Sequence, residues 1–104
     1  MIDDSVVLKL SDNILKRYEP AINEGVMFLF NVDTREIWTG NSSTKYLIKL
    51  IDGETPLNQI YTELYSLYDG FDFEIVKSSF AKIAEELLEK KFAEKVGSLQ
   101  WIEK

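Results

Sequence analysis

The 104-residue sequence contains no cysteine and no histidine, and these two absences exclude several kinds of site. Iron–sulfur clusters are held by thiolates, and most zinc sites need cysteine or histidine ligands. Nucleophilic catalysis by a Cys/His pair or a Ser/His/Asp triad needs histidine as well. The sequence also lacks the glycine patterns of nucleotide-binding loops. We therefore expect a non-catalytic protein without metal, cofactor or disulfide.

Long hydrophobic runs and a basic N-terminus are also missing. The longest apolar run covers residues 26–30, far fewer than the ~18 that a membrane span requires. Asp3 and Asp4 stand where a secretory signal would have positive charge. These features predict a cytoplasmic protein with no membrane partner.

Chain breakers are scarce and acidic residues are in excess. Five glycines and two prolines accompany 45% hydrophobic residues, which is typical of a packed globule rather than a disordered chain. The formal net charge of -6 repels nucleic acid and anionic lipid unless basic side chains gather locally. We expect one domain over residues 1–104.

The first half of the chain has the alternating pattern of β-strands. Residues 6–10 alternate apolar and polar, and residues 14–18 form a second short extended segment before Pro20. The strongest strand is predicted over 25–32, and turn-forming residues then return the chain as a hairpin partner over 36–39. Gly40 is expected to end that strand.

The second half predicts three amphipathic helices. The first follows polar caps at 41–43 and ends at Gly53, and the second starts with Thr55 as its N-cap and Pro56 in its first turn. The third starts after Asp72 and extends to about residue 94. Apolar residues repeat at helical spacing at Leu47, Leu50, Ile51, Leu57, Ile60, Tyr61, Leu64, Tyr68, Val76, Phe80, Ile83, Leu87 and Leu88. The predicted fold is α+β and winged-helix-like, with a three-stranded antiparallel β-sheet followed by three α-helices.

Some residues have both a functional and a plain structural interpretation. Glu85, Glu86 and Glu89 are most simply a solvated helix face, because no histidine or cysteine accompanies them. Tyr61, Tyr65 and Tyr68 are better explained by helix packing than by an aromatic binding strip. The apolar cluster of the C-terminal tail, which comprises Leu99, Trp101 and Ile102, is expected to dock against another surface.

A winged-helix plan also admits DNA binding as an alternative function. In that fold the recognition helix presents its first turns to the major groove. Here those turns contain Asp72 and Glu74, which would repel phosphates. We therefore expect no nucleic-acid partner.

An open sheet edge favours a peptide-binding module instead. The strand at 36–39 has no obvious next strand before the helices begin, so its second edge is expected to stay unpaired. Unpaired edges accept an added strand from a partner peptide. The long last helix would form one wall of a groove along this edge.

Residues 27–92 resemble the PqqD-like domains, the precursor-peptide recognition elements (RREs) of ribosomally made, post-translationally modified peptides (RiPPs). The stretch 28–38 is similar to the strand, turn and strand of that family, and the segments 47–53 and 56–60 are similar to its first two helices. Asn41, Leu64 and the 68–69 pair match as well. The third helix matches through Val76, Phe80, Ile83, Leu87 and Leu88.

The resemblance implies a protein that binds the leader segment of a precursor peptide and presents it to a modifying enzyme, often a radical SAM enzyme. The leader would add to an edge strand over 35–39 and lie beside a helix that starts at Phe73. The residues assigned to the peptide are Arg35, Glu36, Ile37, Trp38, Thr39, Ser79, Lys82, Ile83 and Glu86. Either Ile37 or Trp38 would face the peptide, because Trp38 fits equally well into the core.

Two features differ from the family pattern. Gly40 occupies a position where the family often has a larger apolar residue, and the chain extends beyond a minimal core of about 14–95 at both ends. These extensions are expected to dock the partner enzyme or to close a homodimer. The starting methionine and the lack of a linker predict the discrete form of the domain, whose small members partner radical SAM enzymes that include tyramine-excising spliceases.

Overall fold

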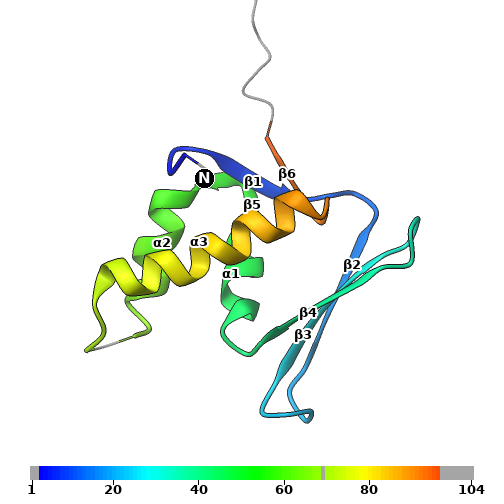
Figure 1. Cartoon of the computed structure of the whole chain (residues 1–104), viewed down its shortest axis with the longest axis horizontal. Coiled ribbons are helices and arrows are strands. Elements are labelled where there is room, and N and C mark those ends of the chain that lie inside the picture. The colour runs from blue at the N-terminus through cyan, green and yellow to red at the C-terminus, as the bar shows by residue number, and fades with distance from the viewer. Residues whose placement is uncertain (1–2, 69, 97–104) are drawn as a thin grey trace, which may run out of the picture.

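The computed structural model describes residues 3–68 and 70–96, and these form an α+β fold with three helices and antiparallel three-stranded sheets (Figure 1). The elements in chain order are β1 (Val7–Leu10), β2 (Ile14–Glu19), β3 (Val26–Asn31), β4 (Ile37–Asn41), α1 (Thr44–Leu50), β5 (Asp52–Pro56), α2 (Leu57–Tyr65), α3 (Phe73–Glu89) and β6 (Ala93–Lys95). The predicted fold class is confirmed. No helix within the described ranges is long and apolar enough to cross a membrane.

The strands form two sheets rather than one. The order β2–β3–β4 is the predicted antiparallel sheet, and a second sheet has the order β5–β1–β6. Neither β5 nor β6 is among the strands predicted from the sequence. Both are short strands that pair with β1, which precedes them by more than 40 residues.

The start of α2 differs from the prediction because Thr55 is in β5. The Asp52 carboxylate accepts the backbone N–H groups of Glu54 and Thr55, each at 2.9 Å, and the Thr55 hydroxyl at 3.0 Å. These bonds, led by the Glu54 N–H, lower the pKa of Asp52 below its ordinary value. Pro56 is the N-cap of α2 and Leu57 its first residue. The prediction of Thr55 as N-cap was therefore wrong.

The end of α3 also differs, and Lys91 is the reason. Lys91 has a left-handed φ of 68°, and its N–H donates to Leu88 while the Phe92 N–H donates to Leu87 at 2.9 Å. This is the Schellman arrangement that satisfies the last carbonyls of a helix. The helix stops at Glu89 rather than near residue 94, and Phe92 is buried as β6 begins. At its other end, Asp72 caps α3 as predicted and accepts the Glu74 N–H at 2.8 Å.

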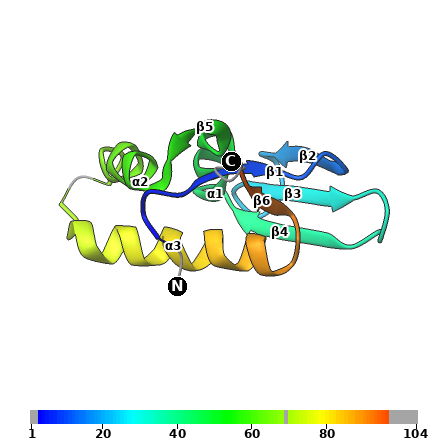
Figure 2. The ribbon, with the colours of Figure 1, turned by 90° about the horizontal axis from the view of Figure 1, so that it is seen from above.

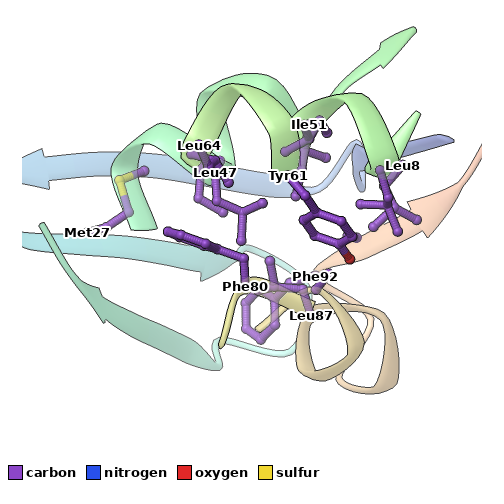
Figure 3. Close-up of a cluster of buried hydrophobic side chains, with 14 of the residues drawn as sticks. Leu8, Met27, Leu47, Ile51, Tyr61, Leu64, Phe80, Leu87 and Phe92 are labelled. Carbon is purple, nitrogen blue, oxygen red and sulfur yellow. The ribbon is translucent and has the colours of Figure 1, made fainter. Parts of the chain in front are cut away.

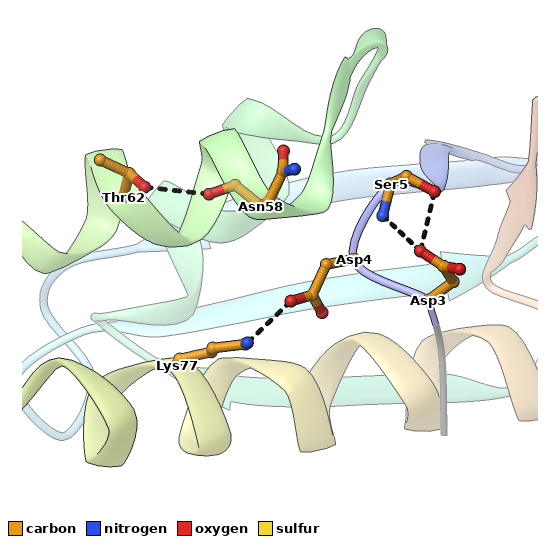
Figure 4. Close-up of polar contacts among 6 residues, drawn as sticks. All are labelled: Asp3, Asp4, Ser5, Asn58, Thr62 and Lys77. Carbon is orange, nitrogen blue, oxygen red and sulfur yellow. Dashed lines mark hydrogen bonds and ion pairs between the residues drawn. The ribbon is translucent and has the colours of Figure 1, made fainter.

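The N-terminal strand belongs to the core and is not a peripheral extension. Leu8 is fully buried, and the Leu57 N–H donates to the carbonyl of Val6 at 2.9 Å. The preceding segment is fixed by the Asp4 carboxylate, which lies 2.7 Å from the Lys77 ammonium of α3 (Figure 4). Leu8 therefore belongs to the hydrophobic core, although it precedes the minimal domain of about 14–95 that the resemblance implies.

Side chains from all three helices meet in one core. Figure 3 shows Leu47 of α1 and Ile51, its C-cap, together with Tyr61 and Leu64 of α2. These side chains point toward Phe80 and Leu87 of α3. Met27, Leu8 and Phe92 close the cluster from the strands and the end of α3. The packing interpretation is confirmed for Tyr61, which is 1% exposed, and for Tyr65, which makes an edge contact with Phe73. Tyr68 packs against Phe80 but also lines the groove described below. The predicted docking of Leu99, Trp101 and Ile102 lies outside the described residues.

Candidate functional site

The β4 strand is one edge of the β2–β3–β4 sheet. Among the described strands it pairs with β3 alone, in antiparallel register from Phe30 opposite Ile37 to Val26 opposite Asn41. Figure 2 shows β4 as the strand of its sheet that lies nearest to α3. The unpaired side of the sheet therefore faces the region of the longest helix.

Alternation along the ladder decides which backbone groups of β4 point outward. The Asn31 N–H donates to the carbonyl of Glu36 at 2.9 Å, which makes this a hydrogen-bonded pair. Bonded and non-bonded pairs alternate in antiparallel ladders, so positions 38 and 40 bond to β3 in turn. Ile37 and Thr39 therefore direct both their N–H and C=O groups toward the open edge.

The edge strand lies two residues later than predicted, because the turn before it is longer. The buried side-chain oxygen of Asn31 accepts the N–H groups of Asp33 at 2.9 Å and Thr34 at 3.0 Å. Arg35 then takes a left-handed φ of 69°, which is compatible with a turn but not with a strand. Arg35 and Glu36 thus precede the strand, and the predicted edge of 35–39 is corrected to Ile37–Asn41.

Gly40 continues the strand instead of ending it, and its lack of a side chain is explained by Thr44 and Trp38. A Cβ at position 40 would come within 2.7 Å of the Trp38 ring and 2.9 Å of the Thr44 methyl group. The Trp38 ring thus occupies the space above Gly40. A larger residue at this position, as the family often has, would not fit beside Trp38.

The two faces of β4 are distinct. Trp38 is 6% exposed and packs in the core, whereas Ile37 is 62% exposed. The outer face of β4 presents Ile37, Thr39 and Asn41 to solvent, whereas Trp38 faces the core. Trp38 packs against the core side of the strand.

A groove lies between the end of β4 and α3. It has a volume of about 290 Å³, and its lining is mostly apolar: Asn41, Ser43, Tyr68, Phe71, Ile75, Val76, Ser79, Phe80 and Ile83. Phe71 and Ile75 are 57% and 61% exposed. Large apolar side chains left this open to water favour a binding surface.

Of the predicted helix residues, the groove includes Ser79 and Ile83 but not Lys82 or Glu86. Lys82 is exposed away from the lining, and Glu86 forms an ion pair with Lys90 at 3.1 Å. None of the predicted strand residues, Arg35 to Thr39, lines the groove. Residues 37–39 belong to β4, the edge strand of the sheet.

Sequence reasoning missed Phe71 and Ile75, although a signal was present. Ile75, Ser79 and Ile83 are spaced by four residues and lie on one face of α3, beside the buried face that contains Val76 and Phe80. An apolar residue adjacent to a complete buried stripe indicates a second apolar surface. The Ser79 hydroxyl donates to the Ile75 carbonyl at 3.0 Å, so its polarity is satisfied within the helix.

The site has no arrangement of acids suited to metal binding. No group of three or more acidic residues that could hold a metal ion occurs in the described ranges. The groove offers apolar surface, and β4 offers backbone hydrogen-bonding groups. The chain matches no protein-family model, and no curated protein or solved structure is significantly similar to it.

Proposed function

We propose that this chain is a cytoplasmic, non-catalytic binding protein for the leader segment of a ribosomally made precursor peptide. The leader adds as a strand to β4 and is presented to a partner modifying enzyme, in line with the resemblance to PqqD-like domains. This resemblance favours a radical SAM enzyme as the partner. Within that class, it favours the tyramine-excising spliceases.

The observation that supports this proposal is the open β4 edge beside an apolar groove. Ile37 and Thr39 supply two outward N–H donors and two outward C=O acceptors. The Asn41 carbonyl is already used, since it accepts the Thr44 hydroxyl at 2.7 Å. An extended peptide on this edge would be held by backbone bonds regardless of its sequence.

The groove adds the sequence preference. Apolar side chains of the peptide would cover Phe71 and Ile75, which are exposed in the free protein. A Kd of about 1 μM corresponds to roughly 8 kcal/mol. A few ladder bonds and two or three buried apolar anchors reach this value even after the cost of ordering the peptide.

Duplex DNA is not favoured as the ligand. Asp72 and Glu74 stand exposed at the start of α3, the end that a winged-helix protein inserts into the major groove. Their charges oppose phosphate binding there. We therefore expect no salt-dependent binding to duplex DNA.

The test is a titration with synthetic leader peptides from precursor genes that neighbour this gene, followed by calorimetry. We expect saturable binding at micromolar Kd or tighter. Thr39→Pro removes an outward N–H and places a ring in the path of the added strand. This variant should weaken binding at least about tenfold, because a lost bond and the steric block together exceed 1.4 kcal/mol.

Thr39→Val is the matched control, because it keeps the N–H and suits a strand. It should bind within about twofold of the parent. The groove is tested by Ile75→Ser, with Leu67→Ser as its control, since Leu67 is 54% exposed but lies outside the groove. Unchanged affinity in a folded Thr39→Pro protein would refute strand addition, and failure to bind any neighbouring leader would refute leader recognition.

A further inference from the structure

A second hollow lies at the opposite edge of the same sheet, between β2 and α1. It has a volume of about 280 Å³ and is bordered by Lys16 and Arg17 of β2 and by Lys45 and Lys49 of α1. Four of the chain's 12 basic residues therefore surround one hollow in a protein of net charge -6. This is a local basic patch on an acidic molecule.

Three of these four cations have no acidic partner among the described residues. Arg17 lies 2.9 Å from Glu19, which neutralises it. No carboxylate of the described residues lies within 4.0 Å of the ammonium groups of Lys16, Lys45 or Lys49. Their positive charge is available to a ligand.

Lys45 is held in place without being neutralised. Its ammonium lies 4.4 Å from the centre of the Tyr18 ring and 4.8 Å from that of Tyr46. Ring contacts of this kind orient a cation while leaving its N–H groups free to bind an anion. Lys49 follows one helical turn later, and like charges at this spacing destabilise a helix by a few tenths of a kcal/mol.

The floor of the hollow is apolar. Met27 and Ile48 are 4% and 2% exposed and line it together with Tyr18. Cations around an apolar floor complement a ligand that has carboxylates next to apolar groups. A polypeptide segment has both, whereas a nucleic acid would present a continuous line of phosphates to a chain that is acidic overall.

We propose that this hollow is a second binding site, which takes a short acidic segment of a polypeptide. Its carboxylates would contact Lys16, Lys45 and Lys49, and neighbouring apolar groups would rest on Met27 and Ile48. The site lies at β2 and α1, and it is separate from β4 and the α3 groove. It therefore stands or falls independently of the proposed leader binding.

The probe is a fluorescein-labelled octaglutamate peptide, titrated at low ionic strength and followed by fluorescence anisotropy. We expect binding that weakens as salt is added, and amide NMR shifts centred on residues 16, 45 and 49. Exposed ion pairs contribute up to about 1 kcal/mol each, so single Lys→Gln changes at these positions should weaken binding about two- to fivefold. The triple variant should lose about 30-fold.

The controls separate the site from general charge effects. Lys95→Gln removes the same charge from exposed β6 and should leave affinity within about twofold. Lys45→Arg keeps the cation and should bind like the parent. The site would be overturned if Lys95→Gln and Lys45→Gln lost the same affinity. It would also be overturned if an octaglutamine peptide bound as tightly as octaglutamate. Competition by oligothymidine or inorganic phosphate as strong as that by octaglutamate would overturn its assignment to an acidic polypeptide.

Discussion

Gly40→Ala is predicted to destabilise the fold although it adds only one methyl group to a strand. The new Cβ would lie 2.7 Å from the Trp38 ring and 2.9 Å from the Thr44 methyl group, and closer still to the Thr44 hydroxyl. Contacts below about 3.0 Å are not tolerated, so atoms around the methyl group must move. Trp38 and Thr44 are 6% and 3% exposed and have little free space.

The size of the effect follows from these neighbours. Overpacking of a filled core costs about 1–3 kcal/mol, and replacing a strand glycine by alanine returns about 0.5–1 kcal/mol of backbone entropy. Thr44 resists displacement because its hydroxyl donates to the Asn41 carbonyl at 2.7 Å. We expect a net loss of about 1–2 kcal/mol in the free energy of unfolding, and about 4–8 °C in Tm for each kcal/mol.

The assay is urea unfolding followed by far-ultraviolet circular dichroism, arranged as a double-mutant cycle with Thr44→Ala. Thr44→Ala alone should cost about 1 kcal/mol, because it removes the hydroxyl bond to Asn41. The double variant lacks the two Thr44 atoms that lie closest to the new methyl group. Its loss of unfolding free energy should therefore be smaller than the sum of the two single losses by about 0.5 kcal/mol or more. Full stability in Gly40→Ala, or strictly additive losses, would refute the explanation of this glycine by its neighbours.

Two further predictions concern the core. Leu8→Ala should cost about 2–5 kcal/mol in urea unfolding, because Leu8 is fully buried in β1; a loss below about 1 kcal/mol would show that this strand is dispensable. Burial, with smaller contributions from the Asp4 and Glu85 charges, raises the pKa of Tyr61 from 10.0 to about 12. The stability from neutral Tyr61 is thus complete below pH 10 and is lost as pH rises through about 12. Tyr61→Phe should remove one late-titrating phenol from the absorbance titration and make the alkaline loss of stability shallower, and an unchanged titration would contradict the assignment.

Local signals predicted the elements whose residues interact mainly with their own neighbours. The alternation over 25–32 found β3, and the helical spacing and the Asp72 cap found α3 and its first turn. The apolar stripe of α2 was equally clear. In each case the pattern and the cap lie within the element itself, so the sequence alone contains the information.

The rest of the fold could not be predicted locally, because it depends on pairing between segments that are distant in the sequence. The strand β5 includes Gly53 and Pro56, and β6 is only three residues long, so neither has strand character of its own. Both exist because β1 lies between them and offers its two edges. Likewise, the left-handed φ of Lys91 that ends α3 has no sequence signal, since a glycine or asparagine is the usual residue there.

The candidate site was predictable in type but less so in detail. An open edge beside the last helix follows from element order, and Ser79 and Ile83 do line the groove. Phe71 was missed because it precedes the helix, and the register of the edge was displaced because Arg35 extends the turn. The basic hollow was not predictable at all, since Lys16 and Lys45 are brought together only by the packing of α1 against the sheet.

The two edges of the β2–β3–β4 sheet differ in a way that supports β4 as the edge for strand addition. Charged side chains on an edge strand oppose pairing with another strand. The β2 strand contains Lys16, Arg17 and Glu19, whereas the five residues of β4 include no charge. An incoming backbone therefore meets less opposition at β4 than at β2. Lys16, which discourages pairing at β2, also contributes to the basic hollow. The charge distribution thus directs a strand to one edge of the sheet and a carboxylate to the other.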